Sequence, residues 1–128
     1  MPRERVVCDL FPPIGPYSHA VKSGNLVFVS GTPGVDPSTG KLAGEGAFEQ
    51  ADQAIRNVID CVIAAGGTEA DITTVQVNLV DVGDFAEMNR AYAAYFSEPF
   101  PARTVIGIAA LPKVGARLTI NAMAVLPL

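Results

Sequence analysis

The 128-residue sequence is poor in the side chains that common catalytic and metal sites use. It contains a single histidine, His19, which argues against a Ser-His-Asp triad. Its two cysteines, Cys8 and Cys61, form no Cys-x-x-Cys motif and have no neighbouring histidine, which argues against a zinc site. No P-loop, GxSxG, HExxH or GxGxxG motif occurs. We therefore expect no metal or cofactor, and two reduced thiols of a cytoplasmic protein.

Charge is also scarce. Charged residues make up 17% of the chain, against about 25% in average soluble proteins. The net charge is −4, and Arg3 and Arg5, the one close basic pair, flank Glu4. Without a basic cluster, nucleic acid is not expected as a partner. So few charges cannot coat a monomer, so we expect apolar surface to be buried between subunits of a symmetric oligomer.

Long hydrophobic runs are missing as well. No run approaches the ~18 apolar residues that cross a bilayer, and the first ten residues have no apolar signal-peptide core. The sequence also has no internal repeat, low-complexity tract or linker. These features favour one soluble domain over residues 1–128, with no membrane partner.

What the sequence does contain is a mixture of strand and helix patterns. Amphipathic spacing predicts a helix from Ala47 to Ala65 and a second one that begins at Asp84 and is stopped by Pro99. Alternation and turn residues predict a loop at 31–40 and strands at 3–7, 20–23, 26–30, 72–80, 104–111 and 118–126. The order is β-β-β-α-β-α-β-β. Two helices can cover only one sheet face, so we predict an α+β sandwich whose other sheet face is bare in a monomer.

Arg103 is the residue that most suggests a ligand site. It precedes the nearly uncharged strand expected at 104–111, and no acidic residue follows Glu98. An unpaired buried guanidinium costs on the order of several kcal/mol, so it needs an anion. Either a carboxylate elsewhere in the fold or a ligand carboxylate can accept two parallel hydrogen bonds from the guanidinium. For His19, a solvated loop position is favoured over a pocket rim.

Four segments carry a resemblance to a known family: GPYSHAV at 15–21, LVFVSGTPGVDPSTG at 26–40, FPAR at 100–103 and ALPK at 110–113. In this order they resemble the signature of the RidA (YjgF-type) reactive-intermediate deaminases, from about Ile14 to the C-terminus. The resemblance implies a chorismate mutase-like fold and a homotrimer whose sheets form a central barrel, with ligand clefts between subunits. It also implies cofactor-free hydrolysis of small 2-imino or 2-enamino acids to 2-keto acids and ammonia.

The resemblance also assigns roles to residues. Arg103 would clamp the substrate carboxylate, Tyr17 would line the cleft, Ser30 and Gly31 would lie beside the ligand, and Asn89 would add a polar group from the second helix. The residues alone leave other roles open. Ser30 could cap its strand, Asn89 could be a solvated helix residue, and Tyr17 could be a packing aromatic.

The chain departs from the family pattern where imine deaminases carry a glutamate on the last strand. Thr119 stands there, Val105 replaces a common cysteine, and the loop between residues 96 and 100 is short. Threonine can position water but cannot accept its proton near neutral pH. We expect Arg103, Tyr17 and Thr119 to act on an imine of the 2-iminobutanoate or 2-iminopropanoate type, where orientation alone can accelerate hydrolysis.

Other functions stay open. One is a non-catalytic protein that binds small carboxylates such as 2-keto acids, which the loss of the glutamate favours. Another is a pathway-specific deaminase for a larger enamine, which the shortened loop would suit. A ribonuclease role, associated with some members, fits poorly with the acidic charge and the single histidine.

Overall fold

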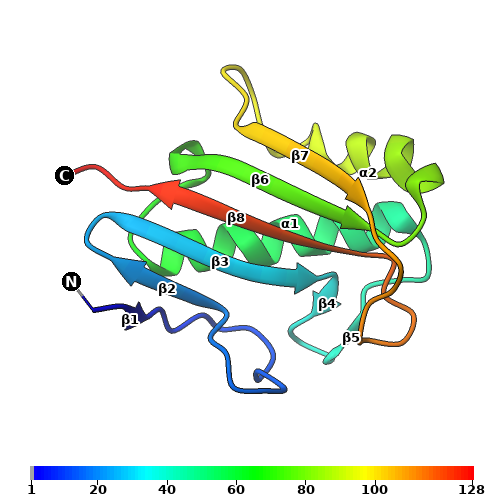
Figure 1. Ribbon diagram of the computed structural model, residues 1–128, viewed down its shortest axis with the longest axis horizontal. Coiled ribbons are helices and arrows are strands. Elements are labelled where there is room, and N and C mark those ends of the chain that lie inside the picture. Colours follow the sequence, from blue (N-terminus) through cyan, green and yellow to red (C-terminus); the bar gives the residue numbers. More distant parts are fainter. Residues whose placement is uncertain (1) are drawn as a thin grey trace.

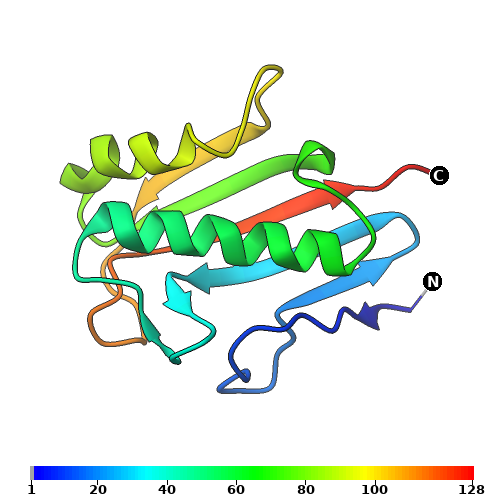
Figure 2. The ribbon, with the colours of Figure 1, turned by 180° about the vertical axis from the view of Figure 1, so that it is seen from behind.

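A computed structural model describes residues 2–128 as a six-stranded mixed sheet with two helices on one side (Figures 1 and 2). The strand order across the sheet is β1-β2-β3-β8-β6-β7, and neighbouring strands are antiparallel except for β6 and β7. The strands are β1 (Glu4–Arg5), β2 (Ala20–Ser23), β3 (Leu26–Pro33), β6 (Ile72–Leu79), β7 (Ala102–Gly107) and β8 (Leu118–Val125). The predicted α+β class is confirmed.

The first helix, α1, spans Ala47–Ala64 and packs across β3 and β8. Its apolar stripe is almost fully buried, with Ile55, Val58 and Val62 at 2% exposure or less. Each such side chain stabilises the fold by about 1.5–3 kcal/mol. The helix ends where Gly66 adopts a φ of +101°, which places the Gly67 N–H 2.9 Å from the Val62 carbonyl.

Two buried amides of α1 hold the loops at one end of the sheet. The Gln50 side chain donates to the carbonyls of Gly44 and Gly115 at 3.0 and 3.1 Å and accepts from the Arg117 N–H at 2.8 Å. Asn57 donates to the Val35 carbonyl at 2.8 Å. These bonds fix the segments that flank the cavity described below.

The segment expected as a loop at 31–40 contains more structure than predicted. β3 continues to Pro33, and β4 (Val35–Asp36) pairs with β5 (Lys41–Leu42) in a small hairpin. Asp36 Oδ1 accepts hydrogen bonds from the Ser38 N–H and hydroxyl, and Gly40 has a φ of +73°. These turn interactions close a hairpin that is too short to show an alternating pattern.

The second helix is shorter than predicted. A 3-10 turn at Val82–Asp84 precedes α2 (Phe85–Tyr92), and the chain leaves the helix before Pro99. Phe96 still packs against Tyr92, with ring centroids 4.7 Å apart, but does so from outside the helix. Asp84 makes no side-chain cap and lies 3.6 Å from Arg117 Nε instead. Phe96 therefore continues the apolar spacing through a tertiary contact, although it lies outside the helix.

The last two strands also differ from their predicted bounds. β7 begins at Ala102 and ends at Gly107, so Arg103 lies within the strand and not before it. β1 is shorter than the expected strand at 3–7. No helix within residues 2–128 has the length and apolar character needed to cross a membrane.

The two faces of the sheet differ sharply. Alternate residues of β6 and β8, such as Val77 and Ile120, are buried under the helices. The opposite face is uncovered in a single chain (Figure 1). It carries half-buried polar side chains and partly exposed apolar ones, of which Phe28 is 36%, Val125 39% and Ile106 41% exposed. The predicted bare sheet face is present.

Candidate functional site

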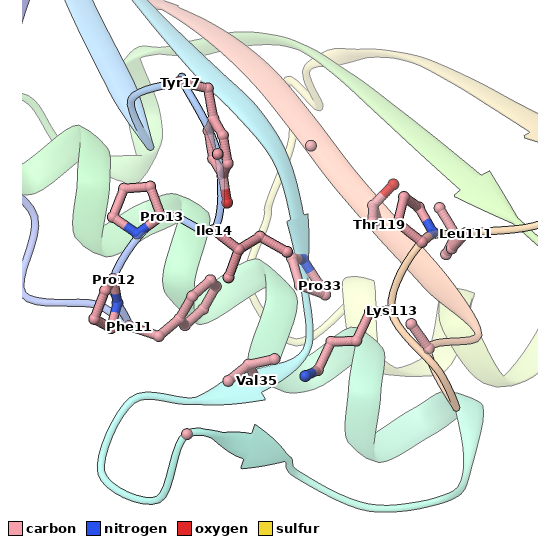
Figure 3. A pocket seen from close by; sticks show the side chains of 15 residues that line it. Phe11, Pro12, Pro13, Ile14, Tyr17, Pro33, Val35, Leu111, Lys113 and Thr119 are labelled. Carbon is pink, nitrogen blue, oxygen red and sulfur yellow. The ribbon is translucent and has the colours of Figure 1, made fainter.

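A cavity of about 580 Å³ lies at one end of the sheet, between the loop 11–15, β3 and the loop 111–113 (Figure 3). Its walls are mostly apolar, with several prolines and glycines. Three of the predicted site residues line it, namely Tyr17, Gly31 and Thr119. Arg103 does not. A volume of this size is typical of small-molecule sites.

A bulge in β3 opens the strand at the cavity. The register with β8 shifts between Val29 and Thr32, so three steps along β3 match two along β8. Such bulges re-aim side chains and interrupt strand pairing. Gly31 lies at this irregularity, and a Cβ there would be 3.6 Å from Thr119 Oγ1. Gly31 therefore leaves just enough room for a small group next to the Thr119 hydroxyl.

Ser30 has a structural role that the sequence left open. Its Oγ donates to the Ser18 carbonyl at 2.7 Å, and its N–H donates to the His19 carbonyl at 2.9 Å. Because the hydroxyl proton is committed to Ser18, Ser30 Oγ can only accept a hydrogen bond from a ligand. Ser30 does not line the cavity.

Thr119 is oriented by an amide network on the open sheet face. Asn78 Nδ2 donates to Thr119 Oγ1 at 3.2 Å and to Asn121 Oδ1 at 3.3 Å, while Asn78 Oδ1 accepts from Gln76 Nε2 at 2.9 Å. Because Thr119 Oγ1 accepts from Asn78, its own proton is free to point elsewhere. The hydroxyl can therefore donate a hydrogen bond into the cavity.

Tyr17 is held at the cavity by His19. His19 is 9% exposed, and its ring packs edge-on against Tyr17 and Phe11, with centroids 5.8 and 4.9 Å away. Its Nε2 donates to the Phe11 carbonyl. The expectation of a solvated His19 is thus wrong, because contacts eight residues away bury it. Tyr17 itself is 42% exposed, so its hydroxyl remains accessible.

Arg103 lies on the helix side of β7, against one face of α2. Its Nη1 donates to Asn89 Oδ1 at 2.7 Å, and its guanidinium carbon is 4.7 Å from the Tyr92 ring centroid and 5.7 Å from that of Phe85. These three partners are four and three residues apart on α2 and so share a face. Burial raises the pKa of Tyr92, an effect that the charge of Arg103 opposes, so the ring beneath the guanidinium stays neutral.

The Arg103 guanidinium has no carboxylate partner within the described chain. The ion pairs among residues 2–128 involve Arg56, Arg90 and Arg117, and no acidic oxygen lies within 4.0 Å of Arg103. The side chain is exposed. One amide and two aromatic rings orient the cation without neutralising it, which leaves its remaining donors available to an anion.

One chain does not bring all the predicted site residues together. Arg103 pairs in register with Val75, which is buried under the helices, whereas Thr119 pairs with Asn78 on the open face. Side chains that alternate along strands point to opposite faces, so Arg103 and Thr119 lie on opposite sides of the sheet. The residues form two groups: Tyr17, Gly31 and Thr119 at the cavity, and Arg103 with Asn89 beside α2.

Comparison with known proteins identifies the family. The family model described as Endoribonuclease L-PSP matches residues 9–126. The chain belongs to this family, that of RidA and YjgF. The resemblance inferred from the four segments is confirmed.

Relatives of this family are close in sequence and structure. Human 2-iminobutanoate/2-iminopropanoate deaminase is 42% identical over 112 residues, covering 88% of this chain and 81% of the human protein. The crystal structure of RidA from the Antarctic bacterium Psychrobacter sp. is 40% identical with a TM-score of 0.90, covering 96% of this chain and 99% of that one. Escherichia coli TdcF with bound serine is 36% identical with a TM-score of 0.88, covering 95% and 98%.

Sequence reasoning assigned no functional role to two residues at or beside the cavity. Lys113 belongs to the ALPK segment and lines the cavity, and His19 supports Tyr17 from behind. Both lie outside regular helix and strand, where no periodicity indicates which way a side chain points. For Lys113, a usable signal was a cation directly after two apolar residues, Leu111 and Pro112.

Proposed function

We propose that this protein hydrolyses small 2-imino or 2-enamino acids to 2-keto acids and ammonia without a cofactor. The observation that carries the proposal is the exposed, carboxylate-free guanidinium of Arg103, held by Asn89 over the Tyr92 ring. A guanidinium of this kind can donate two parallel hydrogen bonds to a substrate carboxylate. The name of the human relative and the serine bound to TdcF support a small amino-acid-derived ligand.

We further propose that each site forms between two subunits of a homotrimer. A small imino acid cannot touch both Arg103 and Thr119 of the same chain, because the sheet separates them. A neighbouring subunit can bring its Arg103 to the cavity that contains Tyr17, Gly31 and Thr119. The uncovered sheet face supplies a surface for this association. Two free cysteines support a cytoplasmic location.

In the proposed reaction, water adds to the C=N carbon and the resulting carbinolamine releases ammonia to leave the keto group. Arg103 binds the carboxylate, and the Tyr17 and Thr119 hydroxyls lie at the reacting end. Thr119 donates a hydrogen bond, because its proton stays free while Oγ1 accepts from Asn78. Its contribution is orientation and not proton abstraction. No RNA cleavage is proposed, since the net charge is −4 and His19 is buried behind Tyr17.

The test is release of 2-oxobutanoate and ammonia from 2-iminobutanoate generated enzymatically in the cuvette. We expect Arg103→Ala to lower kcat/KM roughly 10- to 150-fold, the value of hydrogen bonds to a charged group. Arg90→Ala is the matched control, since Arg90 is an exposed arginine of α2 that pairs with Glu87 at 2.6 Å. Equal rates for the wild type and Arg103→Ala would remove the mechanism.

A second candidate function is a non-catalytic receptor for small 2-keto acids, and Thr119 in place of a carboxylate favours it. Calorimetric titration with 2-oxobutanoate separates the two. Binding that depends on Arg103 in a protein with no turnover identifies a receptor, whereas turnover identifies the enzyme.

A further inference from the structure

The cavity beside Tyr17, Gly31 and Thr119 contains one charge, the ammonium of Lys113. The other lining residues are uncharged, and most are apolar, such as Ile14, Val35 and Leu111. Figure 3 shows the Lys113 side chain extending across the cavity toward Val35. Lys113 is half-buried, and no carboxylate among residues 2–128 lies within 4.0 Å of its ammonium group. A cation that has apolar neighbours and no carboxylate partner is suited to an anion.

The cavity is also much larger than the smallest substrates need. At about 30 Å³ per water molecule, 580 Å³ corresponds to roughly 19 waters. A molecule of 2-iminobutanoate has only seven non-hydrogen atoms. Bound in this cavity, it would leave most of the apolar wall in contact with water. A longer side chain would cover that wall and gain the free energy of apolar burial.

The polar groups lie at separate ends of this space. In Figure 3 the hydroxyls of Tyr17 and Thr119 are on one side, and the Lys113 ammonium is on the other, with apolar side chains between them. The hydroxyls belong to the end where the imine is expected to react. Lys113 therefore faces the far end of whatever side chain the substrate carries.

We propose that the cavity is a side-chain subsite that selects 2-imino acids whose aliphatic chain ends in a second carboxylate, bound by Lys113. The proposal rests on the proposed function, in which Arg103 of a neighbouring subunit binds the first carboxylate. The apolar walls take the methylene groups, and the ammonium pairs with the terminal anion in a partly desolvated setting.

The experiment compares two product-like acids that differ at one end. Both 2-oxohexanoate and 2-oxoadipate have six carbons, but only the second ends in a carboxylate. Isothermal titration of the assembled wild-type protein at pH 7 should show at least about tenfold tighter binding of 2-oxoadipate, the lower range for a hydrogen-bonded charge. Lys113→Met keeps the aliphatic stem and should abolish this preference, so that the ratio of the two affinities approaches one. Lys41→Met, which removes a lysine that does not line the cavity, is the control and should retain it.

Several outcomes would overturn the subsite. These are equal affinity of the wild type for the two acids, no binding of either acid, or a preference that survives in Lys113→Met. The subsite would also be overturned if light scattering gave Lys113→Met a different molar mass from the wild type. That result would mean that Lys113 pairs with a carboxylate of a second copy of the chain. The proposed function fails separately, when hydrolysis of 2-iminobutanoate is absent or does not depend on Arg103.

Discussion

Replacing Gly31 with alanine tests whether the space beside Thr119 is where the substrate reacts. A Cβ at Gly31 would lie 3.6 Å from Thr119 Oγ1 and 3.8 Å from Thr119 Cβ, which are ordinary van der Waals distances. Gly31 is not among the glycines with positive φ, so alanine fits its backbone. We therefore expect the free energy of unfolding to be unchanged or to rise by up to about 1 kcal/mol. The corresponding rise in Tm is at most about 5 °C.

The functional effect of Gly31→Ala should be much larger. The added methyl group fills the gap at the β3 bulge and displaces a bound ligand from the Thr119 hydroxyl. Because a misplacement of about 1 Å can cost about 100-fold in rate, we expect a loss of that order in kcat/KM for 2-iminobutanoate. The assay is 2-oxobutanoate release, with thermal unfolding measured on the same samples.

Gly34→Ala provides the contrasting control. Gly34 is buried, and a Cβ there would overlap the backbone carbonyl of Gln50, which cannot move without shifting α1. We expect this variant to lose about 1–3 kcal/mol of stability. A stable Gly31→Ala protein with the wild-type kcat/KM would refute the placement of the reacting atoms at this bulge.

Three further substitutions probe the remaining parts of the site. Thr119→Glu supplies a carboxylate at the cavity, so hydrolysis at pH 7 should rise at least about tenfold and fall as the new group is protonated near pH 4–5; an unchanged pH profile would contradict this. In the wild type, Arg103 Nη1 lies 2.7 Å from the Asn89 amide oxygen, so Asn89→Asp places a carboxylate next to the guanidinium. This carboxylate competes with the substrate carboxylate, and KM should rise about tenfold more than in Asn89→Ala. Asn121→Asp introduces a charge on the open sheet face, and light scattering should show dissociation, with loss of activity and unchanged far-ultraviolet circular dichroism.

Regular elements were predictable because their burial is periodic. The stripe that contains Ile55, Val58 and Val62 repeats over the whole of α1, and Gly66 provides a chemical stop, so the predicted helix end differs by one residue. β8, and β6 from Val75 onward, alternate between buried and partly exposed residues because one face lies under helices and the other does not. In these cases local pattern and tertiary burial agree.

Prediction failed where a side chain is buried by distant or irregular segments. Phe96 continues the apolar spacing of α2 but packs on Tyr92 after the helix has ended. His19 is covered by Phe11, which lies in a proline-rich loop. The spacing of Phe96 indicates a longer helix than the one that forms, and the contact of His19 leaves no periodic trace at all.

Motif positions could propose the residues of the candidate site, and these roles stay predictions, but they could not give the spatial arrangement of the residues. The motif positions identified Arg103, Tyr17 and Thr119 as candidates. They did not indicate the register of β7 against β6. With the strand expected at 104–111, Arg103 lay outside it and its direction was undefined. Once β7 begins at Ala102, pairing of Arg103 with Val75 fixes its side chain on the helix side. Register between parallel neighbours depends on long-range contacts that local sequence does not encode.

The shortage of charge and the divided site can have a common physical cause. Around a symmetry axis each residue can meet copies of itself, and a charged side chain would then face like charge. Amides do not have this problem, because each carries both a donor and an acceptor and can bond to its own copy. Gln76, Asn78 and Asn121 occupy the open face in a hydrogen-bonded chain that ends on Thr119. The same uncharged network would therefore favour association of identical subunits and hold the Thr119 hydroxyl at the cavity where we propose that a neighbour's Arg103 binds the substrate carboxylate.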